Sequence, residues 1–485
     1  MAAITSLGIG TNGLDLESLV NKLVAGERTP ITQLQSRTAT LKTQLSSYGK
    51  VQSALATVRD AAAKLTKPDT WGASTATSSD TSSVSVTATT GAALGGLAIS
   101  VSQLATAQTV VTGVQPASPA AVGQGSITVE LGKWNADQSA FTSKAGVTAI
   151  TIDIASGEDQ LTQIRDKVNA ANAGVVASVV TDSSGSRLVM RSSSTGEDNG
   201  FRVSVNDADG NSGDATGLSA LAFDPTAGVT SMTQKLAASN AHAMVNGVDV
   251  NSATNTLTTA VDGLSIGLLK VTSGDVSVTV GQDKDSIKKA VTDFATAYSA
   301  LMSLMRDQTK AVPLAKGSKD VSQSGPLQGD ATAVGLQSQL RNIAGGSSTL
   351  GGTLSRLSDL GLEPGTDGTL TVNATKLDAA IARPDDLKKL FMGLDSSNAD
   401  NNGIAQKLRS FADAALGTEG TLSSRQTGLQ TRITNNGTRS TELEAHVGLV
   451  EARLRARYNA LDTQMASLNA LSSYVTQQFA SKSSN

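Results

Sequence analysis

The chain has 485 residues and a formal net charge of −3, so its length corresponds to about three domains and it lacks the overall basic character of a nucleic-acid-binding protein. Hydrophobic residues make up 39% of the sequence, enough for globular cores, yet no apolar run approaches the roughly eighteen residues that cross a bilayer. There is no cysteine, which excludes disulfide bonds, cysteine-bound zinc and thiol catalysis.

The N-terminal region predicts two helices. The first residues lack the basic start and apolar core of a secretory signal peptide, so we expect that export would not use the general secretory route. A short amphipathic helix is predicted over 14–25, ending near Gly26, and Pro30 suits the first turn of a second helix that ends at Leu65. Steps of three and four residues place the apolar side chains of this second helix on one stripe: Ile31, Leu34, Leu41, Leu45, Tyr48, Val51, Leu55, Val58, Ala62 and Leu65.

From about residue 75 to 282 the pattern changes to alternating apolar and polar residues, which is typical of half-buried strands. Single strands are predicted at 84–88, 97–101, 127–131, 150–154 and 201–205, a hairpin at 175–181 and 187–191, and a second β-rich stretch at 232–282. One helix is predicted at 157–172, with Ser156 as its cap and Gly174 at its end.

The C-terminal part returns to helical spacing. A third stripe runs over 287–305, followed by a helix at 331–343, a strand pair at 354–373, helices at 374–382 and 385–392, and a linker at 395–403. The last hundred residues are predicted to be mostly helix, with a break at Asn435-Asn436-Gly437. The apolar positions of this final helix are Leu443, Val447, Val450, Leu454, Tyr458, Leu461, Met465, Leu468, Leu471, Val475 and Phe479.

A long apolar stripe is shielded from water only when it packs against another helix, and the simplest partner for each end of the chain is the other end. We therefore predict an α+β multidomain fold: a helical coiled-coil or bundle leg formed by both chain ends, with nested β-rich head domains inserted between them. The predicted domains are a terminal helical domain (1–40 and 441–485), a helical leg domain (41–75 and 286–440), a β-rich head domain (76–115 and 232–285) and an inserted outer head domain (116–231).

No motif in the sequence predicts catalysis, a cofactor or a metal site. Residues 8–13 match the dinucleotide-binding pattern G-x-G-x-x-G, but no strand precedes them and no acidic residue follows about twenty positions later. Residues 398–403 resemble the start of a calcium loop, but Arg409 occupies the position of the bidentate glutamate. The acidic pair Asp207 and Asp209 is interpreted as a turn. His242 and His446, the two histidines, have no companion at ligand spacing.

Chain ends usually fray, yet the apolar stripes at both ends of this chain are strongly apolar. We therefore predict that they contact copies of the chain or another helical assembly. The segment GIGTNGLDLESLVNKLV at residues 8–24 resembles the N-terminus of the flagellar filament cap family, hook-associated protein 2. Further segments similar to this family occur in the family's order, at 27–31, 48–50, 98–108, 245–249, 255–257, 261–265, 357–362, 368–370, 458–469 and 474–475. The resemblance is loosest over about 110–232.

This resemblance implies a ring, usually pentameric, at the extracellular tip of the bacterial flagellum, where flagellin folds beneath a lid and inserts. It implies export by the flagellar type III apparatus without a cleaved signal peptide, and as partners flagellin, hook–filament junction proteins and a flagellar export chaperone. Residues 1–40 and 441–485 would be feet that grip the filament, through Leu14, Leu16, Leu19, Leu23, Leu461, Met465, Leu468, Leu471 and Phe479. Such a protein would not be an enzyme and would bind no cofactor, nucleic acid or membrane.

Three alternatives remain at this point. The Ser/Thr-rich head could make the protein an adhesin for host glycans or mucin, although the region 75–285 has few aromatic residues. The helical ends are also typical of flagellin or a junction protein, whose sequences do not resemble the segments above. The third alternative, a nucleotide-dependent enzyme, is supported by the glycine pattern at residues 8–13 alone.

Overall fold

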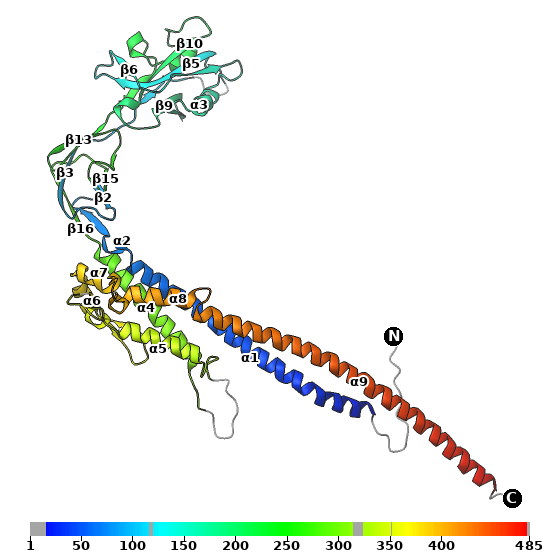
Figure 1. Ribbon diagram of the computed structural model, residues 1–485. Helices are drawn as coiled ribbons and strands as arrows, with labels where there is room; N and C mark the ends of the chain where they lie inside the picture. Colours follow the sequence, from blue (N-terminus) through cyan, green and yellow to red (C-terminus); the bar gives the residue numbers. More distant parts are fainter. Residues whose placement is uncertain (1–15, 116–119, 314–323, 351, 483–485) are drawn as a thin grey trace. The chain divides into compact units, whose positions relative to one another are not determined.

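The computed structural model describes residues 16–115, 120–313, 324–350 and 352–482, apart from the side chains of Leu16 and of residues 479–482. The chain forms two compact units (Figure 1). The leg unit contains Met1–Trp71 and Asp285–Asn485, and the head unit contains Gly72–Lys284. Both ends of the chain thus belong to one unit and the β-rich unit is inserted between them, which confirms the predicted fold class.

The regular structure described in the leg unit is helical apart from one small sheet. Its helices are α1 (Leu16–Leu65), α2 (Pro68–Trp71), α4 (Lys284–Thr309), α5 (Ala331–Gly345), α6 (Ala374–Ile381), α7 (Pro384–Met392), α8 (Ile404–Leu416) and α9 (Thr421–Lys482), with strands β17 (Leu362–Pro364) and β18 (Leu370–Val372). Helices α1 and α9 lie side by side and run antiparallel (Figure 1), because Gln52 pairs with Gln426 while Glu17 pairs with Arg455.

The core of the leg unit brings together the stripes that the sequence predicts. The α4 stripe is buried, and it packs with the part of α1 from Leu41 to Leu65 and with α5, α7 and α8. The ring of Phe294 meets Phe391 edge-on at 6.0 Å, and Trp71 stacks on the same Phe391 at 5.9 Å. The indole of Trp71 donates a hydrogen bond to the carbonyl of Leu65, so the chain is fixed where α1 gives way to α2.

Two predicted helix breaks are wrong. Helix α1 continues through Gly26 and Pro30, and α9 continues through Asn435-Asn436-Gly437. A glycine costs a helix about 1 kcal/mol and a proline about 3 kcal/mol. Val24 and Ile31, on either side of the α1 site, are buried against Val447 of α9. Burying such a side chain contributes about 1.5–3 kcal/mol, so packing between the two helices outweighs these local preferences.

The described residues of the head unit form four antiparallel sheets. The first sheet has the strand order β1 (Ser74–Ser78), β16 (Val276–Gln282), β3 (Gly95–Gln103), β12 (Ala241–Val245) and β13 (Val248–Ser252), and the second has the order β14 (Thr256–Leu257), β15 (Leu264–Leu268) and β2 (Val84–Ala88). The third sheet has the order β11 (Thr233–Leu236), β4 (Thr109–Val111), β9 (Gly185–Ser192) and β8 (Val175–Asp182). In the fourth, β10 (Gly200–Asp207), β5 (Gly125–Trp134) and β6 (Phe141–Ser143) follow each other, and β7 (Ile150–Ile154) also pairs with β5. The predicted hairpin is confirmed as β8 and β9, in register from Val175 opposite Ser192 to Asp182 opposite Gly185.

Helix α3 (Leu161–Ala170) begins later than predicted. Its cap is Gln160 and not Ser156, because the backbone N–H of Gln160 donates to the side chain of Gln163 in a capping box. Close by, Gln108 exchanges two hydrogen bonds with the backbone of Phe201, at 2.8 and 2.9 Å, and Trp134 donates to the same carbonyl. These bonds join Gln108, the residue before strand β4, to strand β10, and Trp134 of β5 to the same place on β10.

Candidate assembly surface

The contact between α1 and α9 weakens toward the chain ends. Near the body of the leg unit, Leu422 and Leu429 of α9 belong to the large core. Farther out, Val20, Val24, Ile31 and Val447 form a separate small cluster, with Leu443, Leu454 and Tyr458 packed partly against it. The distal part of the helix pair therefore buries far fewer apolar side chains than the proximal part.

Arg455 forms an ion pair between the two helices near the described start of α1. Its guanidinium lies 3.1 Å from Glu451 and 3.4 Å from Glu17 on α1, and the hydrogen bond with Glu451 raises the pKa of Arg455. Beyond this point α9 continues to Lys482, about 40 Å of helix. Tyr458 still packs partly against the small cluster, whereas most described side chains of α9 from 459 to 478 are exposed.

This distal end of α9 carries a row of exposed apolar side chains. Leu461 is 47% exposed, Met465 49%, Leu468 58% and Leu471 59%. Tyr474 and Val475 are also exposed. Their spacing places Leu461, Met465, Leu468 and Val475 on one face of the helix.

The structure places the predicted contact residues unevenly. Leu14 lies outside the described residues, and Leu16 and Phe479 are helical but their side chains are not described. On α1, Leu19 is partly buried and Leu23 is 45% exposed, next to the small cluster that includes Val20 and Val24. The set Leu461, Met465, Leu468 and Leu471 forms a second surface farther along α9. Their role in partner contacts stays a prediction.

Sequence reasoning missed exposed apolar residues outside the predicted set. Leu449 is 69% exposed, and Tyr474 and Val475 extend the row on α9. Val475 belongs to the apolar stripe that the sequence predicts for this helix, although it is not among the predicted contact residues. Leu449 lies off the stripe, next to the buried Val447, and only the position of α1 distinguishes the two.

A buried polar clamp holds α1, α5 and α9 together. The Tyr48 hydroxyl donates to Asp330 Oδ1 at 2.6 Å, and Arg425 donates to Asp330 Oδ2 at 2.6 Å. Asp330 also caps α5 by accepting from the backbone N–H groups of Thr332 and Ala333. Burial raises the pKa of Asp330, but the bonds from Tyr48 and Arg425 outweigh it and hold the pKa below its usual value. Burial, with a smaller effect of Asp330, raises the pKa of Tyr48 to about 12.

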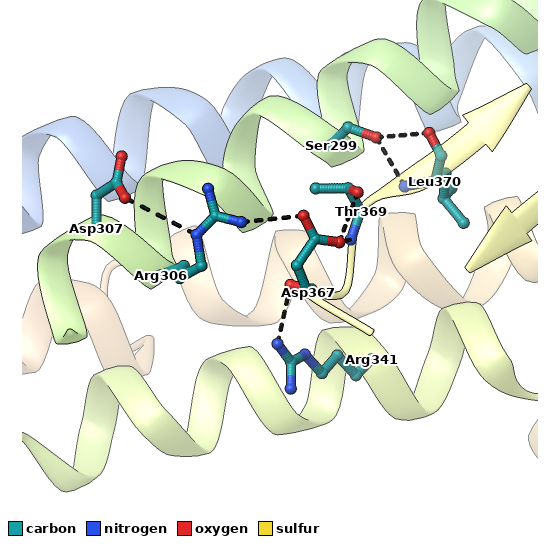
Figure 2. Close-up of polar contacts among 7 residues, drawn as sticks. All are labelled: Ser299, Arg306, Asp307, Arg341, Asp367, Thr369 and Leu370. Atoms are coloured by element: carbon teal, nitrogen blue, oxygen red, sulfur yellow. Dashed lines mark hydrogen bonds and ion pairs between the residues drawn. The ribbon is translucent and has the colours of Figure 1, made fainter. Parts of the chain in front are cut away.

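The β17–β18 hairpin is fastened to α4 and α5 (Figure 2). Ser299 of α4 donates to the carbonyl of Leu370 at 3.1 Å and accepts from its N–H at 2.9 Å. In the turn, Asp367 pairs with Arg306 of α4 at 3.0 Å, and its carbonyl accepts from Arg341 of α5. These bonds fix the hairpin to two helices of the leg unit.

The other candidate motifs form self-contained turns. In the 395–403 segment, Asp395 accepts from Ser397, Asn398 and Asn401, and these hydrogen bonds hold its pKa well below the usual range. Asp207 accepts from the backbone and hydroxyl of Ser219. Residues 8–13 lie outside the described residues.

His242 and His446 are exposed on different units. No group of three or more His, Cys, Asp or Glu side chains that could hold a metal ion occurs among the described residues. None of the described helices combines the length and hydropathy that a bilayer crossing requires.

Comparison with known proteins identifies the family. The model described as "Flagellar hook-associated protein 2 C-terminus" matches residues 238–470, and that described as "Flagellar hook-associated protein 2 N-terminus" matches residues 12–108. Flagellar hook-associated protein 2 of Escherichia coli (strain K12) is 32% identical over 497 residues, which cover 100% of both chains. The chain belongs to the flagellar hook-associated protein 2 family.

Other matches agree with this assignment. The B-type flagellar hook-associated protein 2 of Pseudomonas aeruginosa is 29% identical over 99% of this chain and 98% of that protein. The solved D1-D2-D3 domains of the flagellar cap protein FliD from Escherichia coli share the fold with a TM-score of 0.60, at 29% identity, over 79% of this chain and 99% of that one. A "Flagellin hook IN motif" also matches residues 140–194, within the region where the resemblance is loosest.

Proposed function

We propose that this protein is the structural cap at the tip of the bacterial flagellar filament, where a ring of copies promotes the folding and insertion of exported flagellin and prevents its loss. Membership of the flagellar hook-associated protein 2 family, with a fold similar to that of a flagellar cap protein, supports this role. The observation that carries it is the exposed apolar face of α9 beyond Arg455, which is a surface suited to other protein chains.

In this proposal the protein acts by confinement and placement, without making or breaking bonds. Leu461, Met465, Leu468 and Leu471 would contact filament subunits or neighbouring copies, together with Leu14, Leu16, Leu19, Leu23 and Phe479. Partly buried aliphatic contacts contribute about 1 kcal/mol each. Such contacts suit a grip that must be released after each subunit is added, because no buried ion pair has to be broken.

The finer organisation is part of the same proposal. Residues 1–40 and 441–485 would form the filament-contacting domain, 41–75 and 286–440 the leg, 76–115 and 232–285 the inner head, and 116–231 the outer head. The ring would be a pentamer outside the cell. Export would use the flagellar type III apparatus and its chaperone, and junction proteins would be further partners.

Deletion of the gene tests the role. A strain without the cap should retain its hooks, release flagellin monomer into the medium and lose motility, and expression of the intact chain should restore filaments. Normal filaments in the deletion strain would contradict the proposal. If a relative's cap protein restores filaments in the deletion strain and this chain does not, the proposal is contradicted as well.

The adhesin alternative receives no support from the comparisons. The matching relatives are named as flagellar hook-associated proteins, and the matching structure as a flagellar cap protein.

A further inference from the structure

The outward face of strand β8 is apolar. Val175 and Ala177 are buried in the core of the head unit, and the alternate residues Val176 and Val180, on the other face of the strand, are 53% and 51% exposed. In an antiparallel sheet with one solvated face, the outward positions are normally polar. The outward face of β8 is therefore suited to a contact with another molecule.

A hollow of about 330 Å³ opens on this face and is called here the β8–β9 hollow. It is lined by Val176 and Ser178 of β8, by Val189 and Arg191 of β9, and by the segment 192–195. The guanidinium of Arg191 is exposed and has no ion-pair or hydrogen-bond partner among the described residues. No acidic residue lines the hollow. It therefore combines apolar walls with one uncompensated positive charge.

The turn between β12 and β13 carries the complementary chemistry. Asn246 and Gly247, with φ of +50° and +80°, form a two-residue turn. Val248 is 65% exposed, more than any other large apolar side chain described in the head unit. Asp249 follows it and lies opposite Met244, which is 43% exposed. This β12–β13 tip, residues 246–249 with Met244, thus joins exposed apolar side chains to a carboxylate.

Asp249 differs from the other acidic residues of the head unit. Most of them are held by ion pairs, as Asp182 is by Arg187, or by hydrogen bonds within their own turns, as Asp80 and Asp137 are. The carboxylates that have neither kind of partner among the described residues are those of Asp153, Asp198, Asp249, Asp262 and Asp275. Within this set, Asp249 alone has a large exposed apolar side chain beside it in the chain or across its strand pair.

The tip is kept away from the hollow of its own chain. The other end of β13 is fixed at the rim of the hollow, where the Thr195 hydroxyl donates to the carbonyl of Ala253 at 2.7 Å. At about 3.3 Å per residue, the strand places Val248 about 16 Å from Ala253. Asn246 also exchanges two hydrogen bonds of 2.8 Å with the backbone of Ala98 on β3, which fixes the turn. The two complementary surfaces can therefore meet only between two copies.

We propose that the β12–β13 tip of one copy inserts into the β8–β9 hollow of a neighbouring copy. Val248 packs against Val176 and Val189 of the neighbour. Asp249 pairs with Arg191, which binds a carboxylate through two parallel hydrogen bonds and so fixes the orientation. This inference rests on the proposed function, since it takes the ring of copies as the assembly. A contact between two different surfaces of one chain is heterologous, and a heterologous contact that closes on itself generates a ring.

Charge reversal in the full-length protein tests the pair. Arg191→Asp alone and Asp249→Arg alone each bring like charges together, so each should raise the concentration at which half of the protein is in rings by about tenfold. The double variant Arg191→Asp/Asp249→Arg restores opposite charges at every contact and should assemble within about threefold of the unchanged protein. Light scattering over a concentration series, with negative-stain microscopy of the same samples, measures these shifts.

Matched variants separate the contact from net charge and from folding. Lys270 and Asp262 are exposed in the head unit, outside the hollow and the tip, and their side chains form no ion pair among the described residues. Lys270→Asp and Asp262→Arg change the net charge in the same two directions and should shift assembly by less than about twofold. All four positions are exposed, so the thermal unfolding of each variant should match that of the unchanged protein.

Each other outcome overturns the assignment in a distinct way. If both single reversals assemble like the unchanged protein, the tip does not use the hollow. If the double variant assembles no better than the single ones, the two residues do not pair. If Arg191→Asp forms rings normally but fails to restore filaments in the deletion strain, the occupant of the hollow is a different protein. If the unchanged protein forms no rings, the ring of the proposed function fails, and this contact fails with it.

Discussion

The proximal and distal parts of the α1–α9 pair have similar apolar spacing but very different surroundings. Close to the body of the leg, side chains such as Leu55 and Val58 are fully buried, because α4, α5, α7 and α8 pack around α1. Farther out, the small cluster buries four side chains, and beyond Arg455 the apolar face of α9 is exposed. The same pattern thus forms a core in one place and an uncovered surface in the other.

The difference shows that apolar residues at helical spacing indicate that a helix needs a surface to pack against. They do not indicate whether that surface belongs to the same chain or to another molecule. In the proximal part, other helices of the chain cover the apolar residues. In the distal part, the described residues of the chain cover few of them. Substitutions should therefore affect unfolding strongly in the proximal part and assembly in the distal part.

The largest effect is expected for Phe294→Ala in the proximal core. Phe294 is fully buried and contacts Phe391, so its truncation should lower the free energy of unfolding of the leg unit by about 3–5 kcal/mol. Urea unfolding followed by circular dichroism measures this loss. A loss below 1 kcal/mol would show that the proximal region is not packed as described.

Asp330→Ala should have the next largest effect. It leaves the buried Tyr48 hydroxyl without its acceptor, Arg425 without its partner and α5 without its cap, for a loss of about 2–4 kcal/mol. Tyr48→Phe removes only the hydroxyl and serves as the milder comparison. Equal unfolding curves for Asp330→Ala and the unchanged protein would rule out the clamp.

The clamp also predicts a pH dependence. The pKa of Asp330 is lowered in the folded state, so its stabilising contribution is present above the pKa of an unfolded aspartate, about 3.9, and is lost as the pH falls through the folded value. The stability difference between the unchanged protein and Asp330→Asn should therefore be largest near neutral pH and shrink below about pH 4. A difference that stays constant down to pH 2 would contradict this assignment.

Gly26→Ala should stabilise the leg slightly. Gly26 lies inside α1 with open space where a Cβ would be, so alanine should add about 0.5–1 kcal/mol through its helix propensity. Gly368→Ala is the contrasting control: Gly368 has φ +84°, and an added Cβ would lie 2.6 Å from Arg341, so this change should destabilise. Destabilisation by Gly26→Ala would indicate that α1 breaks there.

The smallest effect on unfolding is expected at the distal end of α9. Met465→Gln/Leu468→Gln should change the free energy of unfolding of the monomer by no more than about 0.5 kcal/mol, because both side chains are about half exposed. The same change should reduce ring formation, as measured by light scattering and negative-stain microscopy. Gln464→Ala/Asn469→Ala, on exposed polar positions of the same turns, should leave assembly intact.

The sequence predicted the type and order of most elements because their periodicity is strong. The strands at 84–88 and 150–154 agree with β2 and β7 residue for residue, and the stripe at 287–305 is buried in α4. The predicted breaks at Gly26 and Gly437 were wrong, because a local preference of about 1 kcal/mol could not be weighed against packing from a segment some four hundred residues away. The clamp depends on which helices lie opposite each other, and spacing along one helix contains no such information.

The two tryptophans of the chain lie in different units, Trp71 in the core of the leg and Trp134 in the head. Replacing Trp134 by phenylalanine would leave an intrinsic fluorophore that reports on the leg alone, and replacing Trp71 would leave one that reports on the head. Emission spectra of the two single-tryptophan proteins would then reveal whether the inserted β-rich unit melts independently of the helices that carry it.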